Sequence, residues 1–255
     1  MADVTGISWT HHTWNWIEGC RRVSEGCRHC YMFEQLTRYG RDPTHPRRTQ
    51  TWDQPYRWEQ RARQNGVREL VFTCSLSDVF IEEADQWRPD AWEVMRDCPH
   101  LMFQILTKRP QRIMDHLPPD WGEGYENVWL GVSIENQQYL WRADTLRQVP
   151  ARVRFISAEP LLGPLPDLDL TGIHWLIVGG ETGPQHRPMD HAWARQLRDK
   201  AKAAGVAFFF KQSSGRFPGR GEMLDGREWK EFPAAYSAIP SPTDNQGNTC
   251  GNDQR

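Results

Sequence analysis

The amino-acid sequence predicts an α/β protein: a partial, TIM-like (β/α) barrel of six to seven parallel strands. Two observations lead to this fold class. Short apolar runs alternate with helical patterns along the chain, and 255 residues give room for six or seven such units. Continuous apolar strands separated by helices are typical of a parallel sheet that is buried on both faces.

The first strand is expected within residues 13–17. Six apolar runs predict the strands that follow, at 70–74, 101–106, 128–132, 153–156, 175–178 and 206–210. The intervening helices are expected at about 30–39, 84–97, 109–116, 136–148 and 190–204. The last of these has the clearest signals, because Asp190 suits an N-cap and Gly205 lies just past its end.

Two regions depart from this alternation. Residues 40–65, rich in Arg, Pro and Trp, are interpreted as an insertion between the first helix and the second strand. Residues 237–255, rich in Pro, Ser, Asn and Gly, are expected to be a disordered tail. We therefore predict a single barrel domain over residues 1–236.

Composition excludes several classes of protein. A formal net charge of −2 argues against a globally basic nucleic-acid binder, and 38% hydrophobic residues argue against wholesale disorder. The longest apolar runs are far shorter than the ~20 residues of a spanning helix, so no membrane association is expected. Because no secretory signal is recognisable at the start, we expect a cytoplasmic location.

Polar residues follow each apolar run, where the carboxyl ends of parallel strands meet. These ends form the mouth of the barrel, and a mouth lined by residues of both charges suits a zwitterionic or phosphate-bearing ligand. Four of these residues are candidate catalytic groups: Lys108, Glu159, Glu181 and Lys211. Nine are candidate cofactor-binding residues: Ser75, Ser77, Asp78, Arg109, Ser133, Glu135, Ser157, Gly179 and Gly180. Alternatively, each glutamate forms a structural pair with a neighbouring lysine or arginine.

Three cysteines, Cys20, Cys27 and Cys30, lie close together as C-x6-C-x2-C and predict a metal site. Zinc would need a fourth ligand, and the candidates are His11, His12 and His29. An iron–sulfur cluster usually takes four thiolates, so three would leave one iron open to substrate. Three further cysteines are scattered; one of them, Cys74, is either a hydrogen-atom donor or a small buried side chain.

A three-cysteine loop after the first strand of a partial barrel resembles the radical S-adenosylmethionine superfamily. That resemblance implies a [4Fe-4S] cluster on Cys20, Cys27 and Cys30, with S-adenosylmethionine bound to the open iron. The first gap is three residues longer than the superfamily's usual C-x3-C-x2-C, which puts cleavage of S-adenosylmethionine in doubt more than cluster binding.

A closer resemblance covers residues 6 to 233, to the phage Gp37/Gp68 family (DUF5131) of radical-SAM-like three-Cys-motif proteins. The matching segments are 14–31, 103–110, 128–136, 159–164, 178–181, 209–212 and 224–227. This resemblance implies the fold and the class of cofactor. It also implies that a three-Cys-motif partner protein and an external reductant are candidate partners.

Three functions follow as hypotheses. The first is a radical-SAM-type enzyme acting on a nucleic-acid base, a nucleotide or a small metabolite. The second is a non-catalytic zinc or iron–sulfur module that binds nucleic acid or a protein, and the third is a redox sensor. Residues 40–65 combine cationic and aromatic side chains, a combination that suits binding of single-stranded nucleic acid. A packed lid with solvated arginines is an equal alternative. The residues concerned are Arg47, Arg48, Trp52, Arg57 and Trp58.

Overall fold

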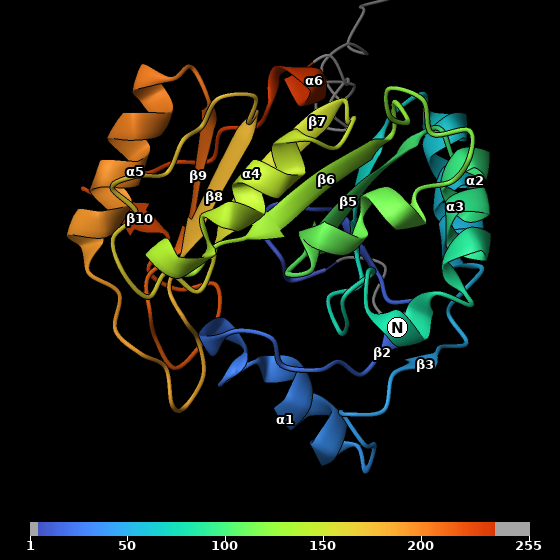
Figure 1. Cartoon of the computed structure of the whole chain (residues 1–255), viewed down its shortest axis with the longest axis horizontal. Helices are drawn as coiled ribbons and strands as arrows, with labels where there is room; N and C mark the ends of the chain where they lie inside the picture. Colours follow the sequence, from blue (N-terminus) through green and yellow to red (C-terminus); the bar gives the residue numbers. More distant parts are fainter. Residues whose placement is uncertain (1–4, 238–255) are drawn as a thin grey trace, which may run out of the picture.

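A computed structural model describes residues 5–237 and confirms the predicted partial barrel (Figure 1). Seven strands form one sheet in chain order, and every neighbouring pair is parallel. The strands are β1 (His12–Trp14), β4 (Glu69–Thr73), β5 (Leu101–Thr107), β6 (Val128–Ser133), β7 (Val153–Ala158), β8 (Trp175–Gly179) and β9 (Ala207–Gln212). The sheet curls without pairing its edge strands β1 and β9 (Figure 1).

Helices α2 to α5 cover the outside of the curled sheet, α1 lies beyond one end of the strands, and α6 lies near the other end (Figure 1). The helices are α1 (Tyr31–Arg38), α2 (Gln54–Asn65), α3 (Arg88–Asp97), α4 (Trp141–Arg147), α5 (His191–Ala203) and α6 (Ala234–Ser237). Single 3-10 turns are η1 (Glu25–Cys27), η2 (Glu82–Ala84), η3 (Pro110–Arg112), η4 (Met114–His116) and η5 (Gln137–Tyr139). Two short hairpin-like pairs complete the fold: β2 (Ile17–Glu18) with β3 (Arg47–Arg48), and β10 (Met223–Leu224) with β11 (Arg227–Glu228).

Two expectations about elements were wrong. The first strand is shorter than 13–17, because the chain leaves the sheet after Trp14 and pairs again only as β2. The expected helix 109–116 is two 3-10 turns. The carbonyl of Arg112 is bonded to the His116 ring (2.8 Å), and the backbone N–H of His116 turns instead to Ile113, so no α-turn propagates.

The expected insertion 40–65 is in part a regular element. Its second half is α2, the crossover helix between β1 and β4, which ends at Gly66 with a φ of 64°. Pro55, Trp58 and Ala62 form its buried face, and the many arginines of this segment concealed that helical spacing in the sequence. The expected tail, 237–255, lies outside the described residues except for Ser237.

Aromatic side chains fill the inside of the barrel toward the amino ends of the strands. Trp175 stands at the centre, with its ring centroid 5.9 to 6.1 Å from those of Trp9, Trp129, Phe155 and Phe209. All five are buried. Edge-to-face and tilted ring pairs are favourable contacts, and here they fill the barrel toward the amino ends of its strands.

Among residues 5–237, no helix is long and apolar enough to cross a membrane.

One close contact makes this packing testable. A Cβ at Gly131 in β6 would overlap the ring of Phe155 on β7. We expect Gly131→Ala to lower the free energy of unfolding by about 1–3 kcal/mol in urea denaturation, because an overpacked ring must shift. Gly163→Ala is the control, since its nearest neighbour would be 3.7 Å away. Adding Phe155→Leu should reduce the penalty of Gly131→Ala; a strictly additive double variant would contradict this account.

Candidate functional site

A cavity of about 660 Å³ opens at the carboxyl ends of the strands. That volume is in the range of small-molecule sites. Fourteen of the residues selected from the sequence line it: Cys20, Cys27, Cys30, Ser75, Ser77, Asp78, Lys108, Arg109, Ser133, Ser157, Glu159, Gly180, Glu181 and Lys211. The remaining two, Glu135 and Gly179, are not among the lining residues.

The cysteine loop, residues 19–30, closes one side of this cavity. It starts at Gly19, whose φ of 90° suits glycine and whose carbonyl accepts a hydrogen bond from Ser77 Oγ (2.6 Å). The 3-10 turn η1 then carries Cys27, and Cys30 is the N-cap of α1. The loop therefore places all three thiols against the mouth of the barrel.

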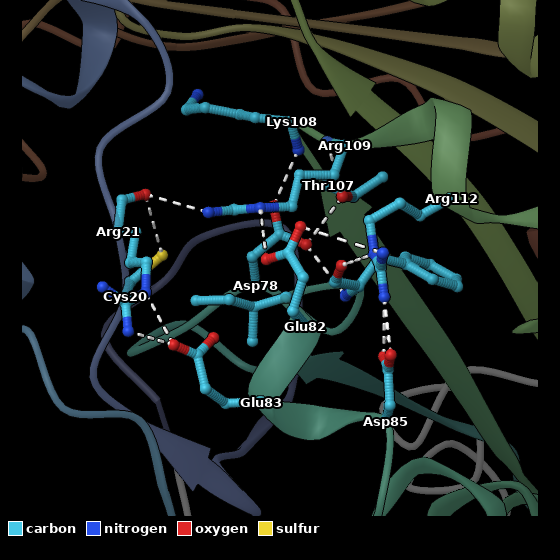
Figure 2. Close-up of polar contacts among 12 residues, drawn as sticks. Cys20, Arg21, Asp78, Glu82, Glu83, Asp85, Thr107, Lys108, Arg109 and Arg112 are labelled. Carbon is cyan, nitrogen blue, oxygen red and sulfur yellow. Dashed lines mark hydrogen bonds and ion pairs between the residues drawn. The ribbon is translucent and has the colours of Figure 1, made fainter.

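Asp78 ties the start of this loop to the ends of β4 and β5 (Figure 2). One carboxylate oxygen accepts from Thr107 Oγ1 (2.6 Å), and the other accepts from the backbone N–H of Lys108 (2.9 Å). The second oxygen also pairs with Arg109 (3.2 Å), whose guanidinium donates in turn to the carbonyl of Arg21 (3.1 Å). The backbone beside Cys20 is thus anchored through Arg109.

Glu135 anchors the middle of the loop from below. It is fully buried. Its Oε1 accepts a hydrogen bond from Ser24 Oγ (2.8 Å) and lies 2.7 Å from Lys108 Nζ, and its Oε2 accepts a hydrogen bond from Arg142 (2.9 Å). A Cβ at Gly26 would overlap the Glu135 side chain, so only glycine lets the loop approach this closely. Glu135 therefore supports the loop next to Cys27.

Glu181 anchors the end of the loop. Its carboxylate accepts three hydrogen bonds from Arg187 (2.6, 2.8 and 2.9 Å) and lies 3.1 Å from Nδ1 of His29. Arg187 also donates to the carbonyl of Glu25 (3.1 Å). Glu181 thus holds the loop between Cys27 and Cys30, and Arg187 holds it just before Cys27.

Both anchoring glutamates are held as anions. Burial alone would raise the pKa of Glu135, but the charges of Lys108 and Arg142 and the bonds from Lys108 and Ser24 outweigh it and lower the pKa. Burial also opposes ionisation of Glu181, and the hydrogen bonds of Arg187 and His29 again lower its pKa. Carboxylates with lowered pKa values are acceptors rather than proton donors at neutral pH.

The charged pair of Lys211 and Glu159 faces the cavity and does not hold the cysteine loop. Lys211 Nζ binds Glu159 Oε1 at 2.6 Å, and both side chains remain 19% exposed. Among the described residues, no hydrogen bond ties this pair to the cysteine loop. Glu159 and Lys211, together with the nearby Ser133 and Ser157 that also line the cavity, are the groups best placed to meet a ligand.

The thiols themselves sit in a desolvated setting with cations near them. Burial raises the pKa of Cys20 to about 12, while the charge of Arg109 acts in the opposite direction. Burial also raises the pKa of Cys30, opposed by Lys108 and Arg22. Metal binding requires thiolates and releases their protons, and these cations favour the bound, anionic form.

The three cysteines have the side-chain chemistry of an iron–sulfur ligand set. Within residues 5–237, no group of three or more His, Cys, Asp or Glu is placed to hold one metal ion. Three thiolates that line one cavity can instead each bind a different iron of a [4Fe-4S] cluster, which leaves the fourth iron open. The [4Fe-4S] cluster that the sequence led us to expect stays a prediction.

Several residues with clear roles were not selected from the sequence. Ser24, Arg142 and Arg187 hold the loop through partners remote in the chain. Ser24 lies in the matching segment 14–31, whereas Arg142 and Arg187 lie outside the matching segments. Asn15 directly follows β1, and its Oδ1 accepts from Ser75 Oγ (3.2 Å) and from the Leu76 N–H (3.1 Å). Its position directly after a strand could have marked Asn15 as a candidate site residue.

The Arg and Trp residues of 40–65 are largely engaged within the protein. Arg47 pairs with Glu18, and Arg48 pairs with Asp90 and stacks on the half-buried Trp52. Trp58 is buried against the ring of His12. These contacts describe a packed segment, the alternative that the sequence left open. Cys74 is likewise buried, with a φ of 64°.

Comparison with known proteins places the chain in a family. The family model "Protein of unknown function (DUF5131)" matches residues 4–233, and the chain belongs to that family, as the resemblance predicted. No curated protein matches the chain. Among solved structures, a double mutant of spore photoproduct lyase with bound AdoMet and dinucleoside spore photoproduct is similar, with 14% identity and a TM-score of 0.46. The match covers 74% of this chain and 60% of that one.

The buried charges around Glu135 generate a prediction about stability. We expect Glu135→Gln to lower the free energy of unfolding by about 3 kcal/mol at pH 7, because Lys108 and Arg142 lose a buried partner. Since the folded-state pKa lies below the ordinary 4.5, the stabilisation is complete above that pH and is lost as the pH falls through the folded value.

Chemical denaturation across the acid range measures this difference. The gap between wild type and Glu135→Gln should shrink below about pH 4. The exposed Glu126, paired with Arg152, supplies the control substitution Glu126→Gln, which should leave stability unchanged. A gap of constant size down to about pH 3 would contradict a role for the ionised carboxylate.

Proposed function

We propose that this member of the DUF5131 family is an iron–sulfur enzyme of the radical S-adenosylmethionine type. In this proposal Cys20, Cys27 and Cys30 hold a [4Fe-4S] cluster, and S-adenosylmethionine binds in the cavity beneath it. The observation that carries the proposal is that three cysteines of one short loop line the same cavity as the polar ends of the strands. The substrate is a nucleic-acid base, a nucleotide or a small metabolite.

The chemistry that the cluster would supply is one electron, from an external reductant, to split S-adenosylmethionine into methionine and a 5′-deoxyadenosyl radical. The chain's own residues bind S-adenosylmethionine and shield the reaction from water. Lys211 and Glu159 offer a cation and an anion side by side, which suits the carboxylate and amine of a zwitterion. Ser133 and Ser157 add hydroxyl groups on the same wall.

The barrel also keeps water from one side of this reaction space. Trp9, Phe72 and Leu106 contribute apolar surface to the cavity, and the aromatic packing around Trp175 fills the barrel beneath them. A reactive radical needs such a wall, because exclusion of solvent suppresses side reactions.

A zinc module is the second candidate, and one contact favours it. Glu181 holds Nδ1 of His29, which leaves Nε2 as the metal-binding nitrogen, an arrangement common among zinc-bound histidines. A zinc site would join His29 to the cysteines and would leave the Lys211–Glu159 pair without a role. In the cluster proposal the His29–Glu181 contact holds the cysteine loop, and the Lys211–Glu159 pair binds S-adenosylmethionine.

Anaerobic reconstitution with iron and sulfide tests the proposal. We expect a brown protein with a broad band near ~400 nm that releases 5′-deoxyadenosine when S-adenosylmethionine and dithionite are added. Cys27→Ala should lose both properties because one iron loses its thiolate. Cys98→Ala is the matched control, since Cys98 is equally buried but lies outside the loop.

Two results would overturn the proposal in different ways. A colourless protein that holds one zinc would replace the cluster by the zinc module. A brown protein that releases no deoxyadenosine would keep the cluster and exclude the enzyme, which leaves a redox sensor or binding module.

The pair facing the cavity generates a separate prediction. Lys211→Met should weaken S-adenosylmethionine binding about tenfold or more, because a hydrogen bond from a charged donor is lost. Calorimetry on the reconstituted protein without reductant measures the affinity, and the ~400 nm band should persist because Lys211 does not hold the loop. Lys202→Met on α5 is the control. Unchanged affinity in Lys211→Met would exclude Lys211 from the binding site.

A further inference from the structure

The rim loop, residues 213–221, stands at the mouth of the cavity. Its base is fixed, because the N–H of Ser213 donates to the carbonyl of Gly221 (2.8 Å) and that of Gly219 donates to Gln212 Oε1 (2.8 Å). The N–H of Gly215 also donates to the carbonyl of Glu181 (3.1 Å). The rim loop is thus held beside the ends of β8 and β9.

The tip of the rim loop displays an aromatic ring between two cations. Phe217 is 58% exposed, and the guanidinium groups of Arg216 and Arg220 each lie 5.8 Å from its ring centroid. In the part of the chain that the structure describes, neither arginine forms an ion pair with a carboxylate. This contrasts with Arg109 and Arg187 inside the mouth, which are both paired.

The tip lies next to the cavity. Pro218 and Gly219, its central residues, belong to the cavity lining. The cysteine loop and α1 present Val23 and Tyr31, which also line the cavity and are 43% and 50% exposed. Exposed apolar and aromatic side chains thus come to the cavity from the rim loop and from the cysteine loop with α1, and the rim loop adds unpaired positive charge.

We propose that the rim loop binds single-stranded nucleic acid and presents one of its bases to the cavity. An exposed aromatic ring flanked by arginines matches the surface that stacks on unpaired bases and contacts backbone phosphates. A small metabolite held inside the cavity would leave this tip unused, and a duplex hides the base faces that Phe217 could cover. The presentation of a base to the cavity rests on the proposed function; binding at the tip does not.

Fluorescence anisotropy with a labelled oligothymidylate of about 12 nucleotides tests the proposal on the reconstituted full chain. Phe217→Ala should weaken binding about fivefold or more, and Phe217→Tyr should restore it. The double variant Arg216→Ala/Arg220→Ala should bind more weakly and flatten the dependence of log affinity on log salt by about 1.4.

The matched control removes the same charge at the other end of the barrel. Arg63 and Arg68 are exposed at the end of α2 and before β4, on the amino side of the sheet. Arg63→Ala/Arg68→Ala should bind like wild type. Equal loss in both double variants would show a general charge effect and overturn the proposal, as would the absence of oligonucleotide binding.

Two competitors decide the class of ligand. Unlabelled duplex of the same length, or a free mononucleotide at equal phosphate concentration, should compete poorly; effective competition by either overturns the single-strand assignment. Because these measurements contain neither S-adenosylmethionine nor reductant, they are independent of radical chemistry. Oligonucleotide binding without deoxyadenosine release would contradict the enzyme and keep the rim-loop site.

Discussion

Hydrogen bonds between charged residues at the ends of the strands and the cysteine loop are the constraint on which the rest of this structure depends. Residues 19–30 have no α-helix or sheet pairing of their own, so their conformation relies on partners elsewhere. Asp78 acts through Arg109 at the start, Glu135 binds Ser24 in the middle, and Glu181 binds His29 near the end. Each anchor lies close to one of the three cysteines along the loop. A loop held at three points presents its thiols in a fixed arrangement.

This use of charge divides the mouth of the barrel into two parts. On the loop side, buried carboxylates and cations neutralise each other, and such pairs contribute geometry more than net stability. On the side of β7 and β9, Glu159 and Lys211 stay partly exposed and face the cavity. The rim loop adds Phe217 and its unpaired arginines outside. In the proposals made above, support of the cofactor, contact with its zwitterionic part and docking of nucleic acid fall to separate groups of residues.

Local patterns were sufficient to predict the strands, the mouth of the barrel and the place of the three cysteines beside it. Apolar runs identify buried strands, and the polar residue after each run marks its carboxyl end. The pairing within the site was beyond such patterns, because Ser24 and Glu135 are 111 residues apart and His29 and Glu181 are 152 apart. The sequence could therefore suggest that a glutamate is either a ligand-binding group or a structural partner, and only the fold separates Glu135 from Glu159. The helix α2 escaped notice because a few buried positions lie among many arginines.

Anomalous diffraction at the iron edge from anaerobically reconstituted crystals tests the central claim most directly. The account predicts a cluster of iron held by Cys20, Cys27 and Cys30, with His29 still bound to Glu181 and no protein ligand on the fourth iron. A single metal ion bound by His29 together with the cysteines, or iron bound away from the cysteine loop, would contradict it.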